Sequence, residues 1–239
     1  MILINKIKKF LKLLNNKTSR RGIFNNIAAN IELESLINEL DFESVLDIGS
    51  SKGQFVLLVE KINPNKIIHS FDPITENIKK QKKFFKNKKN IFFHNYALGN
   101  NSVNQDFFIT NRNDSSSFLK VKKSNNNDYK ILEKRTVPIK KLDQLYSNLK
   151  IAKPILVKID VQGFELNVLK GFEKYLNNIK YLIIEVSDQE LYKGQPLSKN
   201  LINYLNQRNF FKIKENSPSK INGLNVFQKD ILFKNKLFK

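Results

Sequence analysis

One stretch, residues 45–62, constrains the fold of this chain more than any other. It opens with a short apolar run that is typical of the end of a buried parallel strand. Gly49 and Gly53 follow, and apolar residues then recur at helical spacing until Asn63-Pro64 ends the pattern. A strand, a glycine turn and a helix start build the ligand crevice of open α/β sheets, at the carboxyl ends of the strands. The stretch therefore predicts an α/β fold with a binding site beside this turn.

The acid Asp47, two residues before the first glycine, narrows the choice of ligand. A dinucleotide loop has three glycines that press against a pyrophosphate, and a carboxylate at its mouth would repel phosphate. A P-loop needs Gly-Lys-Ser/Thr, whereas this loop has Ser51-Lys52-Gly53. The pattern D-x-G-x-x-x-G instead suits a ligand with a cationic amino-acid end and no phosphate, such as S-adenosylmethionine. A tight turn with an acidic neighbour and no ligand is the alternative.

A second acid, Asp72, ends the next predicted strand, residues 66–72, and lies 25 residues after Asp47. A carboxylate at this place in a nucleotide-type fold accepts hydrogen bonds from both ribose hydroxyls. The alternative is that Asp72 caps the helix that begins near Thr75. Two acids at two successive strand ends are more informative together than either one alone.

Two later apolar runs, residues 155–159 and 181–186, predict buried strands that bring further acids to the same edge of the sheet. The first ends at Asp160, and the second contains Glu185 near its end. Glu165 follows at the start of a helix, where the helix dipole also favours a carboxylate for purely structural reasons. These acids are candidates for chemistry at the predicted crevice.

Composition excludes several classes of site. The 239 residues include no cysteine, which rules out disulfides, thiolate zinc sites and cysteine nucleophiles, and only two histidines. The net charge of +20 suggests nucleic acid, but the excess is almost all lysine, whereas base readout and phosphate forks favour arginine. The chain is also rich in Asn, Ile and Phe, whose codons are A/T-rich, so a compositional bias accounts for the lysine. We therefore do not expect specific nucleic-acid binding.

The N-terminal residues 1–21 carry seven basic groups and no acid, and residues 2–16 predict a basic amphipathic helix. This helix either packs on its own domain or a partner, or contacts an anionic membrane surface. Residues 22–239 are expected to form one domain. No apolar run reaches the ~20 residues that span a bilayer, and lysines interrupt the N-terminal apolar stretch, unlike in a secretory signal. The expectation is a cytoplasmic protein, with peripheral contact at the inner face of the membrane as an open alternative.

Four further segments are predicted. Residues 25–40 show the apolar periodicity of a single helix leading into the first strand. Residues 103–109 predict a strand inserted between the third and fourth core strands, and residues 135–139 a short edge strand, because Pro138 cannot donate a ladder hydrogen bond. The polar run 122–128 has no apolar side chains to anchor it and predicts a loop.

Taken together, these motifs resemble the FkbM-type methyltransferase family. The segments AANIELESLI, VLDIGSSKGQFVLL, FDP, NYALGN, RTVPIKKLDQL, LVKIDVQGFELNVLKG, LIIEVS and LYKGQPL occur in the family's order across residues 21–228. The resemblance implies a class I, Rossmann-like fold with a seven-stranded, mostly parallel sheet flanked by helices and one antiparallel edge pair. It also implies S-adenosylmethionine as cofactor and a hydroxyl of a sugar, polysaccharide or related metabolite as acceptor.

The resemblance also assigns roles to individual residues. It places Asp47, Gly49 and Gly53, with Ser51 of the same loop, around the methionine part of the cofactor. It places Asp72 on the ribose, and Asn95 and Ala97 near the adenine. Four positions depart from the family pattern: Ser50-Ser51 replace Ala-Asn, and Asp72 and Gln162 stand where Glu is common. An aspartate at 72 keeps the ribose role at shorter reach, whereas Gln162 removes a charge.

Methyl transfer to a sugar hydroxyl needs a group that accepts the hydroxyl proton as the new bond forms. Asp160 is the leading candidate, with Glu165 and Glu185 in support and His94 as the next choice. Asp160 and Glu185 could share a divalent cation, but the sequence offers no clear third ligand, so no metal is predicted. The predicted function is S-adenosylmethionine-dependent O-methylation of a small-molecule or glycan acceptor. An RNA methyltransferase and a non-catalytic membrane-docking module are the alternatives.

Overall fold

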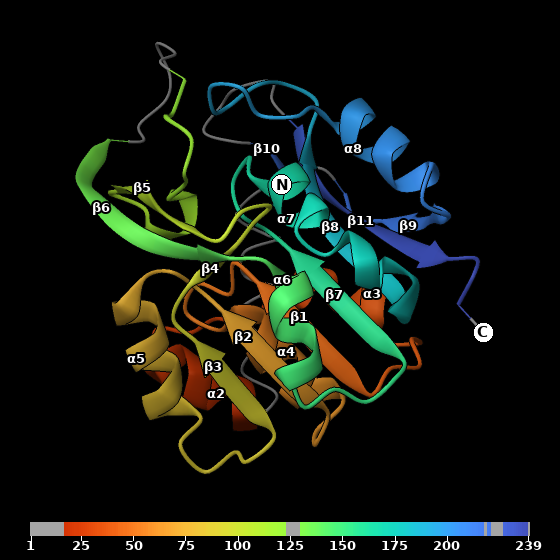
Figure 1. The fold of residues 1–239 in the computed structure, drawn as a ribbon. Coiled ribbons are helices and arrows are strands. Elements are labelled where there is room, and N and C mark those ends of the chain that lie inside the picture. Colours follow the sequence, from red (N-terminus) through yellow and green to blue (C-terminus); the bar gives the residue numbers. More distant parts are fainter. Residues whose placement is uncertain (1–16, 123–129, 218, 221–226, 239) are drawn as a thin grey trace.

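The computed structural model describes residues 17–122, 130–217, 219–220 and 227–238 of the chain. The large sheet has the strand order β3-β2-β1-β7-β8-β11-β9, with the short β10 also paired to β11 (Figure 1). Strands β3, β2, β1, β7 and β8 are parallel, and β11 runs antiparallel to both β8 and β9. The predicted seven-stranded α/β sheet with an antiparallel edge pair is thus confirmed, with β10 as an eighth strand. The strands of this sheet are β1 (Ser44–Ile48), β2 (Ile67–Phe71), β3 (Ile91–His94), β7 (Ile155–Ile159), β8 (Ile179–Ser187), β9 (Phe210–Glu215), β10 (Ser219–Lys220) and β11 (Phe227–Asn235).

The central strands β1 and β7 are buried on both faces of the sheet. Successive side chains point to opposite faces, so Val45 packs into one hydrophobic core and Leu46 into the other. The core around Val45 includes the buried side of α4, and the core around Leu46 contains apolar residues of α6, α7 and α8. Two covered faces explain why these strands read as continuous apolar runs rather than as alternating ones.

The helices flank this sheet as in Figure 1. The α-helices are α2 (Lys17–Phe24), α3 (Glu34–Ile37), α4 (Gln54–Ile62), α5 (Thr75–Phe84), α6 (Leu142–Leu145), α7 (Glu165–Lys170) and α8 (Ser198–Asn206). The 3-10 turns are η1 (Ile31–Leu33), η2 (Asn113–Ser115), η3 (Tyr146–Asn148) and η4 (Glu173–Asn178). None of the helices in the described ranges is long and apolar enough to cross a membrane.

The single helix predicted over residues 25–40 is wrong. Helix α2 ends at Phe24, and only a 3-10 turn and the four-residue α3 form within the predicted range. Asn26 adopts a φ of +54°, which an α-helix does not allow. The apolar periodicity was real, because Ile27, Leu33 and Ile37 are all buried, but the backbone reaches that burial in separate short turns. Helix α2 also crosses the predicted domain boundary at residue 21, and the predicted helix 2–16 lies outside the described residues.

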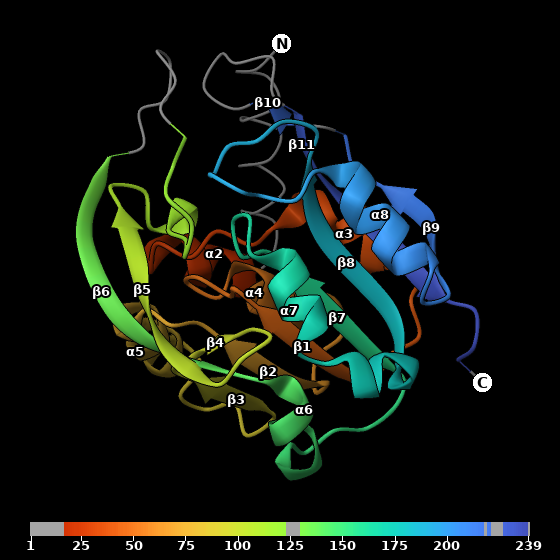
Figure 2. The ribbon, with the colours of Figure 1, turned by 45° about the horizontal axis from the view of Figure 1, so that its top comes forward.

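A second, three-stranded sheet is inserted between β3 and β7, where the sequence predicted an extra strand. Its order is β4-β6-β5, with β4 (Ala97–Leu98), β5 (Val103–Thr110) and β6 (Ile131–Lys140). Figure 2 shows β5 and β6 rising beside the large sheet, on the same side of the molecule as α5. The run 123–129 between these two strands, which holds most of the predicted polar loop, lies outside the described residues.

The prediction of a short edge strand at residues 135–139 is wrong in both respects. Strand β6 is ten residues long and lies in the centre of the small sheet. Pro138 is tolerated there because β4 pairs only with Ile139 and Lys140, while Pro138 is opposite Asn104 of β5. At Pro138, therefore, one side of β6 has no neighbouring strand, and the missing N–H interrupts no ladder on that side.

Candidate functional site

The carboxyl ends of β1, β2, β7 and β8 open into one cavity of about 460 Å³. Strand β1 lies between β2 and β7, where the strand order reverses, which is the usual ligand position in open α/β sheets. The small sheet and the segment after β5 form the opposite wall. The predicted site residues that line the cavity are Asp47, Gly49, Ser51, Asp72, Ala97, Asp160 and Glu185.

Asp47 is fully buried at the wall of this cavity, and neither of its carboxylate oxygens has a hydrogen-bond partner among the described residues. Burial raises the pKa of Asp47 to about 6; nearby Lys158 lowers it, and Asp160 raises it further. A buried carboxylate without partners is costly. Its oxygens are therefore available to a cationic group that enters the cavity.

Gly49 makes the turn after β1 possible. Its φ is +82°, and an added Cβ would lie 1.9 Å from the carbonyl oxygen of Asp160. Only glycine combines this backbone conformation with so close an approach. The turn therefore packs directly against the end of β7. Gly53, with a φ of +88°, begins α4 and does not belong to the described lining of the cavity.

Asp72 is held in place by donors from two neighbouring segments. Its Oδ2 accepts a hydrogen bond from the Ser51 backbone N–H at 2.8 Å, and its Oδ1 accepts bonds from the Ile74 N–H at 2.8 Å and the Asn77 side chain at 3.2 Å. Burial nevertheless raises the pKa of Asp72 to about 7, because these donors offset only part of the desolvation. The carboxylate is thus fixed between the glycine loop and α5.

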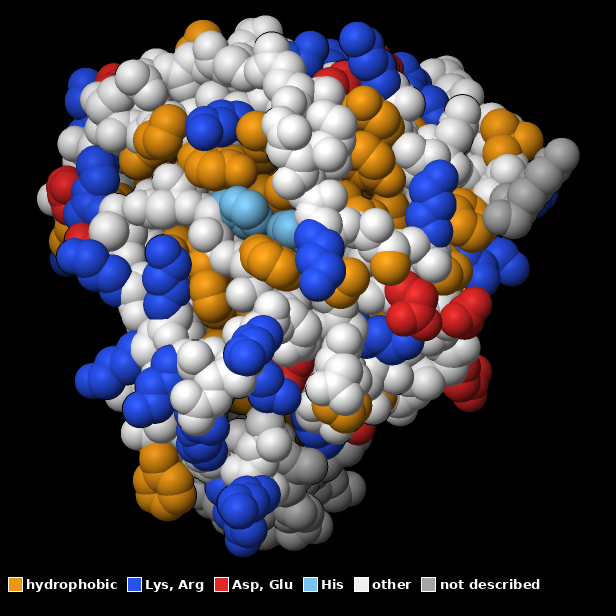
Figure 3. Space-filling view, turned by 60° about the horizontal axis from the view of Figure 1, so that its bottom comes forward, with side chains coloured by type: hydrophobic (Ala, Val, Ile, Leu, Met, Phe, Trp, Pro, Cys, Tyr) orange, Lys and Arg blue, Asp and Glu red, His pale blue; other side chains and the backbone are white. Residues whose placement is uncertain are grey.

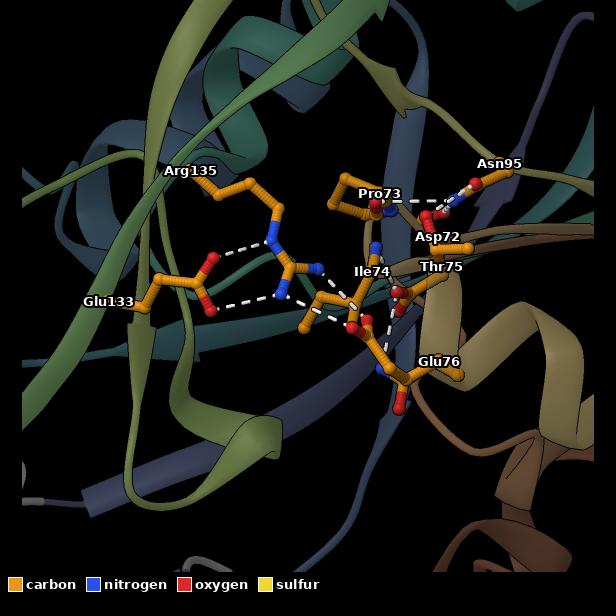
Figure 4. Close-up of polar contacts among 9 residues, drawn as sticks. Asp72, Pro73, Ile74, Thr75, Glu76, Asn95, Glu133 and Arg135 are labelled. Atoms are coloured by element: carbon orange, nitrogen blue, oxygen red, sulfur yellow. Dashed lines mark hydrogen bonds and ion pairs between the residues drawn. The ribbon is translucent and has the colours of Figure 1, made fainter.

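Asn95 supports the segment around Asp72 rather than lining the cavity. Its side-chain amide donates to the backbone carbonyls of Asp72 and Pro73 at 3.1 and 3.2 Å, and its Oδ1 accepts from the Thr75 hydroxyl (Figure 4). Ala97 does line the cavity. Of the two residues predicted near the adenine, Ala97 therefore lines the cavity and Asn95 does not.

Arg135 ties the small sheet to the large one close to this segment. Its guanidinium forms paired hydrogen bonds with Glu76 in the first turn of α5, at 2.9 and 3.2 Å, and with Glu133 of its own strand, at 2.8 and 2.9 Å (Figure 4). The hydrogen bonds from Arg135 hold the pKa of Glu76 below its ordinary value. The Arg135–Glu76 contact therefore joins β6 to the helix that follows Asp72.

Asp160 and Glu185 line the cavity at the carboxyl ends of β7 and β8, and they belong to one polar network. Lys158, buried in the middle of β7, donates to Asp160 Oδ2 at 2.9 Å. The amide nitrogen of Gln162 donates to both Asp160 Oδ1 and Glu185 Oε2, each at 2.9 Å. Burial, followed by the charges of Asp160 and Asp230, raises the pKa of Glu185 well above its ordinary value. Two carboxylates therefore face the cavity in a fixed arrangement.

Lys158 carries a signal that the sequence prediction overlooked. Burial alone would lower its pKa, but the carboxylates of Asp160, Asp47 and Asp230 outweigh this effect and raise it above its ordinary value. A lone lysine inside the apolar run 155–159 indicates a buried, paired charge, because lysines are almost never fully buried without a partner. Arg112, Asp114 and Gln228 also line the cavity, and their positions depend on the folded arrangement alone.

Two predicted catalytic residues lie outside the cavity. Glu165 is buried beneath it, and its Oε1 accepts hydrogen bonds from the backbone N–H groups of Gly163 and Val161 at 2.9 and 3.3 Å. Burial raises the pKa of Glu165 to about 7. Its contacts stabilise the turn after β7, which precedes the helix that Glu165 begins.

His94 lies at a different place on the sheet. Its Nε2 is 3.0 Å from Nδ1 of His69, and its Nδ1 is 3.2 Å from the Tyr96 hydroxyl. Figure 3 shows imidazole surface bordered by hydrophobic side chains. Burial, with the neighbouring His69, lowers the pKa of His94 to about 4. The structure does not bring His94 to the cavity, and the ring is a satisfied member of an aromatic cluster.

No group of three or more histidine, cysteine or acidic side chains is arranged to hold a metal ion in the described ranges. Asp160 and Glu185, the pair considered for a cation, both accept hydrogen bonds from Gln162 instead.

Comparison with known proteins places the chain in a family. The model of the Methyltransferase FkbM domain matches residues 47–212, so the chain belongs to the FkbM methyltransferase family. This match confirms the predicted family and enzyme class, an S-adenosylmethionine-dependent methyltransferase.

The names of two relatives mention a sugar acid or a 2-O position. The hexuronic acid methyltransferase AglP of Haloferax volcanii is 35% identical over 63 residues, which cover 26% of each chain. The 2-O-methyltransferase NoeI of Sinorhizobium fredii is 24% identical over 173 residues, covering 69% of this chain and 71% of NoeI. The matched region thus spans about a quarter of AglP and most of NoeI.

Solved structures are similar at low identity. TrmK from M. capricolum in complex with S-adenosyl-homocysteine has a TM-score of 0.49 at 14% identity, covering 89% of this chain and 70% of TrmK. The Methanococcus jannaschii fibrillarin pre-rRNA processing protein has a TM-score of 0.49 at 13% identity, covering 88% and 77%. Both TM-scores are below 0.5, so the fold assignment does not use these structures. It rests on the sheet order of the chain itself.

Proposed function

We propose that this chain transfers a methyl group from S-adenosylmethionine to a hydroxyl of a sugar or a related glycan. One observation carries the proposal: two carboxylates that suit the cofactor, Asp47 and Asp72, line the same cavity as two that can accept a proton, Asp160 and Glu185. The names of AglP and NoeI, a hexuronic acid methyltransferase and a 2-O-methyltransferase, support an oxygen acceptor on a sugar.

The residues present fit the cofactor. The unpartnered, buried carboxylate of Asp47 suits the ammonium of the methionine part, with Gly49, Ser51 and Gly53 shaping the loop beside it. Asp72, anchored by backbone and amide donors, can still accept the two ribose hydroxyls through the remaining lone pairs of its oxygens. We assign the adenine to the wall near Ala97, with Asn95 supporting that segment from behind.

When bound, the cofactor supplies an activated methyl group whose transfer needs little covalent help from the protein. The chain then has two tasks. It must hold the acceptor hydroxyl in line with the methyl group, because alignment alone can lower the barrier by ~7–11 kcal/mol. It must also accept the hydroxyl proton, and we assign this task to the pair Asp160 and Glu185.

The acceptor space is polar, which suits a ligand with many hydroxyls. Gln162, Gln228 and Arg112 line it together with the two carboxylates, and Phe118 and Phe164 supply apolar surface. Polar side chains beside aromatic surface match the alternating hydroxyl and C–H faces of a sugar ring. The same wall holds Arg112, which lies 3.6 Å from Asp114 and adds a positive charge for an acceptor that carries a carboxylate.

The test separates cofactor binding from transfer. Binding of S-adenosylhomocysteine is measured by calorimetry, and transfer of labelled methyl groups is measured with a panel of methyl glycosides of neutral hexoses and hexuronic acids. We expect Asp72→Ala to weaken binding, and Asp160→Asn to reduce transfer while binding is retained. Asp188→Asn, an exposed acid just past β8, is the matched control. Unchanged binding and transfer in both variants, or transfer only to RNA, would reject the proposal.

A further inference from the structure

The side chain of Gln162 lies between the two carboxylates of the acceptor space. Its Nε2 is 2.9 Å from Asp160 Oδ1 and 2.9 Å from Glu185 Oε2. Its Oε1 is 2.9 Å from the hydroxyl of Tyr192, which is almost fully buried. The backbone of Gln162 is fixed as well, because its carbonyl accepts a hydrogen bond from Ser117 at 2.7 Å. The amide is therefore held at both ends.

The hydrogen-bonding capacity of an amide determines which way this side chain points. An amide nitrogen carries two hydrogens and the amide oxygen carries none, so only the nitrogen can face two carboxylates. Each N–H then serves one carboxylate, and the oxygen accepts from the Tyr192 hydroxyl. Rotating the amide by half a turn would place its oxygen against two carboxylate oxygens. In the observed orientation both N–H groups have carboxylate partners, and the amide oxygen shares the single Tyr192 hydroxyl hydrogen with the Ser115 carbonyl, which is also 2.9 Å from that hydroxyl.

The backbone at Gln162 indicates that this placement matters. Its φ is +55°, in the left-handed region that non-glycine residues rarely adopt, and Gly163 follows with a φ of +95°. Two successive residues with positive φ turn the chain sharply after β7, and that turn directs the Gln162 side chain back towards Asp160. Residues held in sparsely populated conformations persist where their surroundings determine them fully.

Neighbouring carboxylates repel each other unless a proton, a cation or a hydrogen-bond donor lies between them. We propose that the Gln162 amide takes the place of a bridging cation between Asp160 and Glu185, holding both carboxylates towards the acceptor and leaving Glu185 as the proton acceptor. This inference rests on the proposed function, because only that function supplies a methyl acceptor at this place. The hydrogen bonds of Gln162 do not depend on the proposed function. Gln162 is a positioning residue, because it acts through the two carboxylates.

The two carboxylates differ in their charged partners, and this difference is the reason for assigning proton acceptance to Glu185 rather than to Asp160. Asp160 has the Lys158 ammonium at 2.9 Å, whereas Glu185 has no cation within ion-pair distance among the described residues. Gln228 gives Glu185 a second neutral donor at 3.2 Å. The ionised form of Glu185 is therefore the less compensated one. In methyl transfer, the acceptor O–H bond would break, its proton would go to a Glu185 oxygen, and the electron pair left on the acceptor oxygen would form the bond to the methyl carbon. The bond between that carbon and the cofactor sulfur would break at the same time, with its electron pair staying on the sulfur of the leaving thioether.

The first experiment follows the titration of Glu185 by carbon NMR on protein labelled at glutamate side chains, with Glu185→Gln used to assign the signal. Gln162→Met keeps the chain length and removes both donors. Gln162→Glu replaces the donors with a third carboxylate. We expect the Glu185 titration to move to higher pH in both variants, and further in the second, because each change destabilises the ionised form. Gln207→Met, an exposed glutamine after α8, should leave it unchanged.

The second experiment uses Mn²⁺ alone as the probe, followed by electron paramagnetic resonance. We expect no specific site in the unaltered chain. Gln162→Glu should create a site with a dissociation constant on the order of 10⁻⁴ to 10⁻³ M, because three carboxylates then surround the former amide position.

Three results would overturn the proposal. Equal Mn²⁺ binding by the unaltered chain would show that a cation, and not the amide, joins the carboxylates. A failure of Gln162→Glu to bind Mn²⁺ would show that the amide does not occupy a cation position. An unmoved Glu185 titration in Gln162→Met would show that the hydrogen bonds have no electrostatic effect.

If Gln162→Met does not fold, Tyr192→Phe provides the same test, because it frees the other end of the amide and should move the titration in the same direction. None of these measurements uses methyl transfer. A chain that methylates no sugar would therefore reject the proposed function and leave this result intact.

Discussion

The unpartnered carboxylate of Asp47 should make the cofactor-free protein less stable than it could be. Asp47 is fully buried, and its pKa rises from 3.8 to about 6, chiefly because of burial. The folded state thus holds a proton more tightly than the unfolded state, so stability falls as pH rises from about 4 to 6. A shift of about two units corresponds to a penalty of about 3 kcal/mol, which is present in full above pH 6.

Asp47→Asn removes the charge at nearly constant volume. The buried amide has its own cost, but that cost does not depend on pH, so the pH-dependent part isolates the carboxylate. We expect the unfolding free energy of the variant, relative to the unaltered chain, to rise by up to about 3 kcal/mol between pH 4 and pH 7.5. Urea unfolding at several pH values measures this difference.

Cofactor binding should offset most of this difference in stability. At a hundredfold excess over its dissociation constant, S-adenosylhomocysteine would stabilise the unaltered chain by about 2.7 kcal/mol. Asp47→Asn should gain much less, because it loses the partner of the ligand's ammonium. Asp188→Asn is the control at an exposed position and should show neither effect. A stability difference that stays constant across pH would refute the reasoning, and so would equal stabilisation of both chains by the ligand.

Three further predictions concern Asp72, Arg135 and Gly49. Because the ribose hydroxyls would donate to the ionised form of Asp72, whose pKa is about 7, calorimetry should show S-adenosylhomocysteine binding weaken as pH falls below 7. Asp72→Asn should remove the part of this dependence near pH 7 and leave the part near pH 6 that comes from Asp47. Arg135→Met should cost stability by less than about 1 kcal/mol, since its pair with Glu76 is exposed, yet weaken ligand binding measurably in the same assay. Gly49→Ala should lower the melting temperature sharply, because its Cβ would meet the Asp160 carbonyl at 1.9 Å.

Local sequence patterns predicted those parts of the fold that local physics decides. The buried parallel strands were found because short apolar runs that end at acids and glycines rarely form anything else, and β7 matches its predicted range of 155–159. The helix over residues 25–40 failed because burial periodicity says nothing about a φ of +54° at Asn26. The edge position of residues 135–139 failed because it depended on how short the partner strand β4 is.

The candidate site also has a part that local sequence patterns predict and a part that they do not. Asp47, Asp72 and Asp160 lie at or just past strand ends, so parallel pairing alone brings them to one edge of the sheet. Gln162 and Tyr192 are 30 residues apart in the chain, and no pattern predicts the hydrogen bond that joins them. His94 also lies at a strand end, but it packs among aromatic rings instead. A strand end places a residue at the correct edge, while the direction of the side chain depends on its neighbours.

The contact between the Gly49 turn and the carbonyl of Asp160 has a consequence for how such a site can change over time. The Gly49 turn, at the proposed cofactor end, and the backbone of Asp160, on the proposed acceptor side, meet without room for a methyl group. Neither can shift without moving the other, so the distance between donor and acceptor ends is inherited as a unit. A new acceptor would therefore have to be accommodated at the opposite wall, which the small sheet and the segment after β5 form.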